Sequence, residues 1–343
     1  MRLAIADENQ HPLHDELISS VAAAATETGL DARRLSDPAR EGEFDVLLML
    51  GSAHAYPSFL AAPHRTRRIC WYGENLPAFR ASSVERIARA LPSARLLDLV
   101  HDTVGRLAGP KTRDRILRLR EQAAVEREWG RNARELSRAH AWFDELVVSS
   151  RNRVAGAALV GWQARQVAFG YHAAMFGPLV AASEGDRDID VLFLGRDVAA
   201  RGRRARWLDD FKRRLGPEPR VVVVDGGLYG AERHALVRRA RVMVDIHRVP
   251  NNSTGLRYLI GAAAGVALVS ETSSDDWLPR PHEHVVEVSR SSLVDAVRTL
   301  LGDETRRIRL VEASQNLLRG ELSMAVSLER VLRAGADTIS PSK

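Results

Sequence analysis

The sequence is poor in cysteine, lysine and aromatic residues. It has a single cysteine, Cys70, and three lysines among its 50 basic residues, while aromatic residues make up 6% of the chain. One cysteine excludes an internal disulfide and any cysteine-rich metal site. No stretch interleaves basic with aromatic residues, so nucleic-acid binding is not favoured. The excess of arginine over lysine is instead typical of a GC-rich genome.

The chain also lacks long hydrophobic runs. Its longest apolar stretches, near residues 154–161 and 258–269, are too short to span a bilayer. The opening MRLAIADENQ turns polar after six residues, which predicts no signal peptide. We therefore expect a cytoplasmic protein without a transmembrane segment. The formal net charge of +6 suits anionic small molecules or an acidic membrane face, so peripheral membrane contact stays open. The sequence indicates no oligomeric state.

Several short chemical motifs are absent as well. The chain contains no Walker sequence, no G-x-G-x-x-G and no G-x-S-x-G, so no Ser-His-Asp site can be assigned. No spacing of His, Asp and Glu predicts a metal site. His282 and His284 flank Glu283 in a loop bounded by proline, which is typical of a surface segment. We expect neither a metal nor a cofactor.

Strands alternate with helices twice along the 343 residues, of which 45% are hydrophobic. Runs such as FDVLLMLGS are typical of parallel strands buried on both faces. The pattern predicts an α/β protein of two doubly wound, Rossmann-like domains. We expect an N-terminal domain over 1–176, a linker over 177–188, a C-terminal domain over 189–320, and over 321–343 an amphipathic helix and a tail. The pattern also predicts a helix over 15–28, a strand over 165–170 and a helix over 231–240.

Residues 241–271 read as a strand, a polar loop, a helix and a second strand. The loop caps the helix and leaves its first backbone N–H groups free, which with the helix dipole make an anion site. Such sites lie at the carboxyl end of a parallel sheet, and we expect a diphosphate there. A capped helix also occurs in any doubly wound protein, so this unit alone leaves both interpretations open. The loop residues are Asn252, Ser253, Thr254 and Gly255.

Cationic side chains surround the expected anion site. Arg196 follows a strand and a glycine, and Arg203 lies two turns further on. His247 and Arg248 follow the strand at its carboxyl end, and Arg257 lies one turn into the helix. Arginine at such positions can clamp a diphosphate with charge-assisted hydrogen bonds. Solvated loop arginines and a packed histidine at a strand end would give the same pattern.

In the first half, ionisable side chains follow three strands at their carboxyl ends. Glu74 follows the fourth strand and His54 the third, and either can deprotonate an acceptor hydroxyl across a cleft. His11 and His14 follow the first strand and are candidates for the acceptor side. The alternatives, an ordinary turn acid and packed loop histidines, stay open.

A series of motifs follows in the second half. The motifs are DVLFLGR (190–196), the Arg203-Arg204 pair, Tyr229-Gly230 with Glu232-Arg233, VDIHR (244–248), GLRYLIGAAAGVALVSE (255–271) and DETRRIRLVEAS (303–314). Together they resemble the two-domain nucleotide-sugar glycosyltransferases of the GT-B fold, and most of all the group 1-like set that includes the spore-maturation CgeB proteins. The resemblance implies that the C-terminal domain binds the nucleotide diphosphate and the N-terminal domain the acceptor.

The sequence departs from this family at one point. Group 1 enzymes usually carry two glutamates seven residues apart, and the matching positions here are Ser253 and Ile260. The usual contacts to ribose or sugar must then come from elsewhere, and Glu271 is the candidate. The resemblance therefore does not identify the donor.

The resemblance implies a hexosyl- or related glycosyltransferase. Its co-substrate would be a nucleotide-diphosphate sugar, its acceptor a small molecule or a glycan, and it would need no metal. Positive groups around the diphosphate would stabilise the charge that develops as it leaves. The alternative is a catalytically inactive GT-B protein that serves as a binding partner, which the missing glutamate pair favours. An epimerase or phosphorylase of the same architecture is disfavoured. A phosphorylase would usually need a lysine that binds pyridoxal phosphate, and the three lysines here lie in a loop, on a helix surface and in the tail.

Overall fold

The computed structural model describes residues 1–8, 11–52, 55–63, 66–73, 129–183, 185–195, 203–247, 255–273 and 279–333. The elements of the first part are β1 (Arg2–Ala6), α1 (Pro12–Glu27), β2 (Asp31–Leu35), η1 (Pro38–Glu43), β3 (Val46–Leu50), α2 (Pro57–Ala61), β4 (Arg67–Tyr72), η3 (Ala139–Ala141), β5 (Glu145–Val148), α6 (Arg151–Ala158), β6 (Arg165–Gln166) and α7 (Ala173–Phe176). A further helix spans 129–138. The elements of the second part are β7 (Ile189–Leu194), α8 (Arg203–Leu215), β8 (Val221–Val224), α9 (Gly230–Val237), β9 (Ala240–Asp245), α10 (Gly255–Ala263), β10 (Ala267–Glu271), β11 (Val286–Val288), η4 (Arg290–Ser292), α11 (Leu293–Gly302), α12 (Glu304–Arg319) and α13 (Met324–Leu332).

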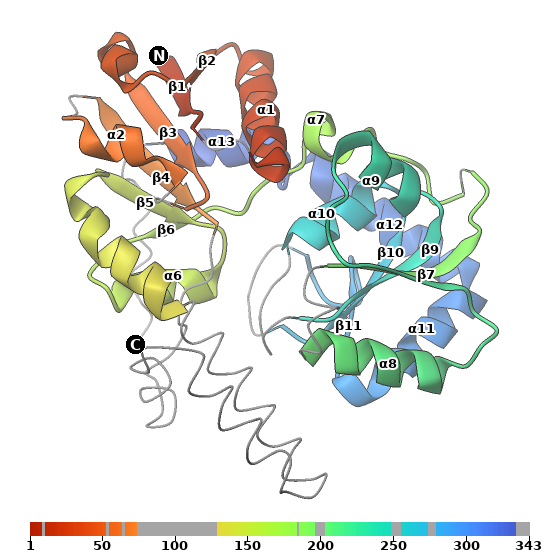
Figure 1. Ribbon diagram of the computed structural model, residues 1–343. Coiled ribbons are helices and arrows are strands. Elements are labelled where there is room, and N and C mark those ends of the chain that lie inside the picture. The colour runs from red at the N-terminus through yellow and green to blue at the C-terminus, as the bar shows by residue number, and fades with distance from the viewer. Residues whose placement is uncertain are drawn as a thin grey trace, which may run out of the picture.

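Within the described residues, the strands form two separate sheets with helices against both faces (Figure 1). The first sheet has the order β2-β1-β3-β4-β5-β6 and the second the order β11-β10-β9-β7-β8. The strand pairs of both sheets are parallel. This arrangement confirms the prediction of two doubly wound α/β units.

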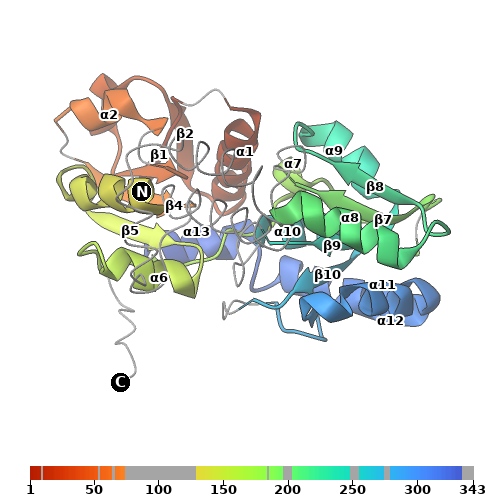
Figure 2. The same cartoon turned by 60° about the horizontal axis from the view of Figure 1, so that its bottom comes forward.

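The strand β3 of the first sheet is apolar at every residue, because both of its faces are covered. Successive side chains of a strand point to opposite faces. Leu47 and Met49 belong to the hydrophobic cluster that includes Phe59 of α2, whereas Leu48 belongs to the cluster on the other face. That second cluster contains residues of α1 and, from the far end of the chain, Met324 of α13 (Figure 2). Both faces are covered by helices, so every residue of β3 is buried.

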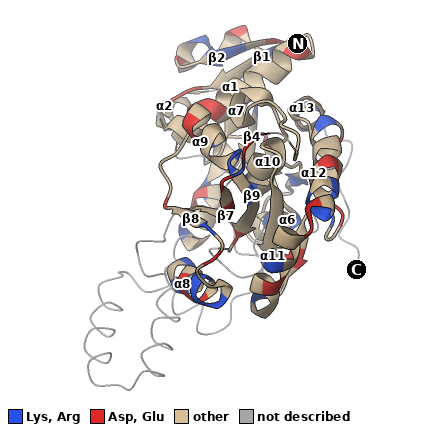
Figure 3. Cartoon of the chain, turned by 90° about the vertical axis from the view of Figure 1, so that its right-hand side faces the viewer, with Lys and Arg blue, Asp and Glu red and all other residues tan. Residues whose placement is uncertain are grey.

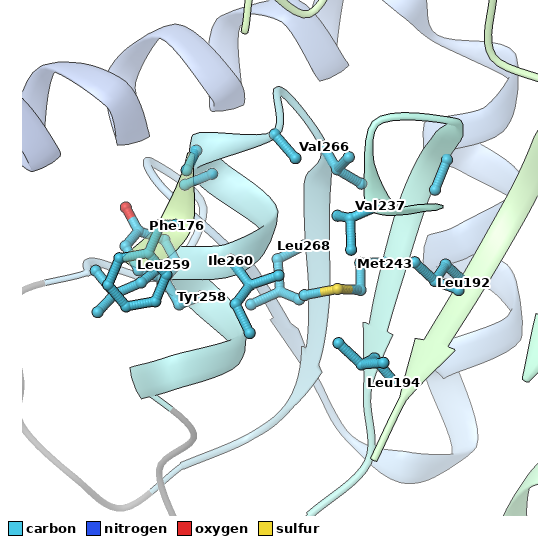
Figure 4. Close-up of a cluster of buried hydrophobic side chains, with 14 of the residues drawn as sticks. Phe176, Leu192, Leu194, Val237, Met243, Tyr258, Leu259, Ile260, Val266 and Leu268 are labelled. Atoms are coloured by element: carbon cyan, nitrogen blue, oxygen red, sulfur yellow. The ribbon is translucent and has the colours of Figure 1, made fainter. Parts of the chain in front are cut away.

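In the second sheet, α10 lies close to the strands beneath it. Gly261 lies in the last turn of this helix, and a Cβ there would lie 3.0 Å from Met243 Cε of β9. Figure 4 shows Met243, Leu268 and Ile260 in one hydrophobic cluster between α10 and the sheet. From the first turn of the same helix, the Arg257 side chain bonds with Leu194 and Asp245, the last residues of β7 and β9.

The chain passes between the two sheets twice, and the two passages are bonded to each other. The Tyr171 amide donates to the Leu322 carbonyl at 2.7 Å, and the Met324 amide donates to the Tyr171 carbonyl at 2.7 Å. A Cβ at Gly170 would overlap the Ser323 backbone, so glycine is required for this contact. The second passage leads α13 back onto the first sheet.

Beside these passages, the helix α1 also contacts the second part. Glu16 accepts a hydrogen bond from the Gly230 amide at the start of α9, and its Oε2 lies 2.8 Å from Arg233 Nη2. The imidazole of His11, after β1, lies edge-on to the ring of Tyr229, after β8, with 5.6 Å between ring centroids. Loops that follow strands of each sheet thus meet, so the carboxyl ends of both sheets face the same space.

Three element boundaries differ from the sequence predictions. The helix α1 begins at Pro12 and not at 15, because the His11 side chain caps it by accepting from the Leu13 amide. The strand over 165–170 is limited to Arg165–Gln166, since the chain then turns toward the second sheet. The helix α9 ends before 240, because Ala240 already pairs with β7.

Candidate functional site

The carboxyl ends of β7, β9 and β10 lie side by side in the second sheet. Asp245 is the last residue of β9 and Glu271 the last of β10, and Asp245 lies opposite Ser270 in register. The strand β7 ends at Leu194, and Gly195 follows it. Ligands of open parallel α/β sheets bind outside these ends. The polar residues at this edge therefore form the candidate site.

Arg257 reaches from the first turn of α10 to this edge. Its Nη1 lies 2.5 Å from Asp245 Oδ1, and its Nε donates to the Leu194 carbonyl at 2.7 Å. Asp245 is 0% exposed and the Arg257 side chain 15%, so water screens their attraction only weakly. A Cβ at Gly195 would lie 3.1 Å from Arg257 Nη2. The guanidinium thus lies against backbone that carries no side chain at the end of β7.

His247 ties the end of β9 to the end of β10. Its backbone N–H donates to Glu271 Oε2 at 2.7 Å, and its Nε2 lies 3.1 Å from Ser270 Oγ. The Ser270 hydroxyl gives its one hydrogen to the Glu271 carbonyl at 3.0 Å, so His247 Nε2 is the donor to Ser270. The imidazole is 1% exposed. In this conformation His247 orients the Glu271 carboxylate and does not face open space.

Sequence reasoning missed two residues that belong to this edge. Asp245 stands in VDIHR as an acid at the end of a buried strand, and that position was the available signal. Glu287 of β11 lies opposite Ser270 in register, and burial raises the pKa of its carboxyl group above the usual value. No sequence pattern marks Glu287. Its strand has only three residues, and the order of strands in the sheet decides that it lies beside Ser270 of β10.

Of the Arg203-Arg204 pair, the second residue has a clear structural role. Arg204 is buried, and its Nε donates to the Ile246 carbonyl at 2.9 Å. It therefore anchors α8 to the end of β9. The side chain of Arg203, the predicted ligand, lies outside the described part of the structure.

In the first sheet, the two predicted acceptor-side histidines have different surroundings. His11 caps α1 and contacts Tyr229, as described above. His14, one turn later, is 8% exposed, and its Nε2 lies 2.9 Å from the Tyr56 hydroxyl. Burial lowers the pKa of His14 below its usual value, an effect that Asp7 opposes and the nearby His11 reinforces. Of the two histidines near the carboxyl edge of the sheet, His14 is therefore the more deeply buried.

The remaining predicted site residues lie outside the described residues, except Gly255, which begins α10. Those outside are His54, Glu74, Arg196, Arg248, Asn252, Ser253 and Thr254.

The charged surface of the described helices carries both signs, as α8 and α12 show in Figure 3. On α8, Asp210 pairs with Arg213 and, at 3.9 Å, with Arg214. Among the described residues, no group of three or more His, Cys, Asp or Glu is arranged to hold a metal ion. None of the helices in these residues combines the length and the apolar character needed to cross a membrane.

Comparison with known proteins gives a family and a fold. Residues 134–333 match the family described as glycosyl transferase-like. Among solved structures, the Anabaena protein Alr3699/HepE in complex with UDP-glucose matches with a TM-score of 0.53 and 10% identity, covering 96% of this chain and 98% of that one. The T4 phage β-glucosyltransferase matches with a TM-score of 0.52 and 14% identity, covering 96% and 97%. No curated protein matches. At these identities the structural matches show the fold alone, which is the predicted two-domain GT-B fold.

Proposed function

Since the chain belongs to the glycosyl transferase-like family, we propose that it transfers a sugar from a nucleotide-diphosphate donor to an acceptor hydroxyl. The observation that carries the proposal is the Arg257 guanidinium, held by Asp245 beside Gly195 at the carboxyl edge of the second sheet. Guanidinium groups and helix N-termini both bind phosphate oxygens. The proposal puts the diphosphate at this edge, with the sugar toward the first sheet.

Other donor contacts in the proposal come from the sequence. Arg196, Arg203 and Arg248 would add positive charge, and the loop 252–254 would offer backbone amides. Glu271, which the His247 amide orients, would contact the ribose or the sugar. The Glu271 contact would replace the glutamate pair that other group 1 enzymes carry.

The chemistry follows from the charge that leaves with the diphosphate. Arginine N–H groups aimed at the phosphates would stabilise that charge in the transition state, as a metal ion does in other enzymes. We therefore propose a metal-independent transfer. The family branch proposed is the CgeB-like one, the transferred group a hexose or a related sugar, and the acceptor a small molecule or a glycan.

The acceptor would bind at the first sheet. A base on that wall is needed if the sugar is transferred by direct displacement. Glu74 and His54 are the candidates from the sequence. A retaining transfer would instead use the departing phosphate to deprotonate the acceptor.

The test is calorimetry with UDP and UDP-glucose, followed by measurement of UDP release. UDP-glucose is the first donor to try, because the HepE structure contains it. A Gly195→Ala variant should bind UDP more weakly than wild type, since its Cβ would lie 3.1 Å from both Arg257 Nη2 and the Phe193 ring and would shift the guanidinium, whereas Gly42→Ala, with nothing within 4 Å of its Cβ, should bind normally. Equal affinity in both variants would remove this edge from the donor site. Donor binding without turnover across acceptors would support the inactive binding protein instead.

A further inference from the structure

The side chain of His14 contacts the Tyr56 hydroxyl, which is itself hydrogen-bonded to the end of β3. The Tyr56 hydroxyl, from the residue that precedes α2, accepts from the Leu50 amide at 2.9 Å and donates to the Leu50 carbonyl at 2.7 Å. The pairing of β1 with β3 ends at Ile5 and Leu48. Leu50 lies beyond that pair, and the Tyr56 hydroxyl bonds with the backbone groups of Leu50 that no residue of β1 reaches. The same hydroxyl oxygen lies 2.9 Å from His14 Nε2.

Counting hydrogens assigns the tautomer of His14. A tyrosine hydroxyl has one hydrogen and accepts with its lone pairs. The Leu50 carbonyl can only accept, so the single Tyr56 hydrogen goes to it. The contact with His14 therefore needs a hydrogen from the imidazole, which puts the proton of the neutral ring on Nε2. Nδ1 is left as a hydrogen-bond acceptor and a base.

Nδ1 lies beside a stretch of backbone without a side chain. Gly51 follows β3 with a φ of +85°, and the nearest atom to a Cβ built there is His14 Nδ1, at 4.0 Å. Gly73, after β4, lies next to it and donates its amide to the Gly51 carbonyl at 3.4 Å. In the part of the chain that the structure describes, His14 makes one side-chain hydrogen bond, the one to Tyr56. The edge formed by Gly51 and Gly73 belongs to the space that the second sheet faces.

We propose that His14 Nδ1 is the base that takes the proton of the acceptor hydroxyl, an inference that rests on the proposed function. The acceptor O–H bond breaks and its proton passes to Nδ1, while the acceptor oxygen forms a bond to the anomeric carbon of the donor sugar. The bond from that carbon to the diphosphate oxygen breaks, and its electron pair leaves with the diphosphate. The imidazolium then releases the proton to solvent. This direct displacement inverts the anomeric configuration, and Tyr56 acts as a positioning residue.

The charges around His14 agree with a neutral ring near pH 7. Burial is the main effect and lowers the pKa of His14. Asp7 and Asp15 raise this pKa, whereas His11 and Arg34 lower it. Arg34 also pairs with both aspartates, its Nε lying 2.9 Å from Asp7 Oδ2, which weakens their effect on the imidazole. A histidine with a lowered pKa is already unprotonated at neutral pH, as a base must be.

The first test concerns the tautomer and needs no substrate. Long-range ¹H–¹⁵N NMR spectra of histidine-labelled protein at neutral pH should show His14 with its proton on Nε2. In Tyr56→Phe the acceptor for that proton is removed, so a mixture of the two tautomers is expected. A wild-type spectrum with the proton on Nδ1 would overturn the inference, because that nitrogen could then accept no proton.

The second test is turnover of UDP-glucose and a panel of other nucleotide sugars, measured as nucleotide release. His14→Gln keeps an N–H for Tyr56 but removes the base, so kcat should fall roughly 10²–10⁴-fold with unchanged UDP affinity. The rise of kcat/KM with pH in wild type should also be lost. The control is His172→Asn, which replaces a histidine that caps α7 outside the site and should keep wild-type kcat.

The outcomes distinguish the role of His14 as a base from the proposed glycosyl transfer. Near-normal kcat in His14→Gln, or a product that retains the anomeric configuration, would overturn the role of His14 while transfer itself stands. A collapse of kcat in Glu74→Gln or His54→Gln but not in His14→Gln would do the same. Nucleotide-sugar binding by wild type with no turnover would instead refute the transfer, and the role of His14 with it.

Discussion

The ion pair between Arg257 and Asp245 offers the most direct test of how the second sheet builds its site. Two substitutions of similar shape remove its charges, Arg257→Gln and Asp245→Asn. They differ in what they leave behind. Asp245 is 0% exposed, and its ion pair with Arg257 is the contact that balances its charge. Arg257 is partly exposed and keeps its hydrogen bond to the Leu194 carbonyl.

The two losses in unfolding free energy should therefore be unequal. Arg257→Gln leaves a buried carboxylate without its partner, which costs about 3–5 kcal/mol. Asp245→Asn keeps an oxygen that accepts from Arg257 and loses only the charge of the hydrogen bond, about 1.5–3 kcal/mol. In the double variant neither charge is left unpaired. The double variant should be more stable than the sum of the single losses predicts, by about 0.5–3 kcal/mol.

Urea unfolding of the four proteins, followed by circular dichroism, measures these differences as shifts in the midpoint. The control is Arg213→Gln, which removes an arginine of α8 that is 75% exposed, and it should change stability by less than about 0.5 kcal/mol. Equal losses in both single variants, with a strictly additive double variant, would refute the view that Arg257 and Asp245 act as a buried pair.

Four further predictions concern the proposed donor site and the stability of the fold. Arg196→Ala should weaken UDP binding by about 1.5–3 kcal/mol, the range for a charged hydrogen bond, and calorimetry with an unchanged Kd would remove Arg196 from the site. Turnover should survive EDTA, because arginines carry the phosphate charge in the proposal; activity that is lost and then restored by Mg²⁺ or Mn²⁺ would contradict this. Gly170→Ala should cost at least about 1–3 kcal/mol in urea unfolding, because its Cβ overlaps the Ser323 backbone, whereas Gly42→Ala has nothing within 4 Å and should unfold like wild type. Stability should fall as the pH drops below 6.5, because the unfolded chain then binds protons that buried or half-buried histidines of lowered pKa do not. Thermal unfolding across pH 5 to 8 should show a smaller fall in His284→Asn, where Asn keeps an acceptor for the Arg280 amide, and an identical pH profile would exclude His284 as a contributor. The histidines concerned are the buried His14, the half-buried His234, and His284, which is 8% exposed and not at the surface as the sequence predicted.

The sequence by itself determined the fold class and the positions of most elements. Apolar runs such as the one at 46–50 identify strands buried on both faces. A strand inside a covered parallel sheet has no face in solvent, so its sequence does not alternate between polar and apolar residues. The order of strands and helices in each half then predicts two doubly wound sheets. The glycine at 29, with a φ of +75°, ends α1 for a local reason that a sequence can carry. These features depend on neighbours within a few residues.

The site could be predicted only as a region. Polar residues near strand ends mark the carboxyl edge of a parallel sheet, so Arg257 and His14 became candidates from position, whereas Glu271 became one from the family resemblance. What each side chain binds was not predictable. Arg257 reaches back across 12 residues to Asp245, and His14 reaches across 42 residues to Tyr56. The order of strands in the sheet and the placement of the helices bring these residues together, and neither can be predicted from a local sequence pattern.

Tertiary structure alone decided which nitrogen of His14 carries the proton and which acid holds Arg257. The reason is that both depend on how backbone groups at strand ends are satisfied. Beyond the last residue of a ladder, an N–H and a C=O still need partners, and a side chain from elsewhere supplies them. Tyr56 does this for both groups of Leu50, and Arg257 does it for the carbonyl of Leu194. A sequence shows where strands end, but only the packed molecule determines which side chain arrives to complete them.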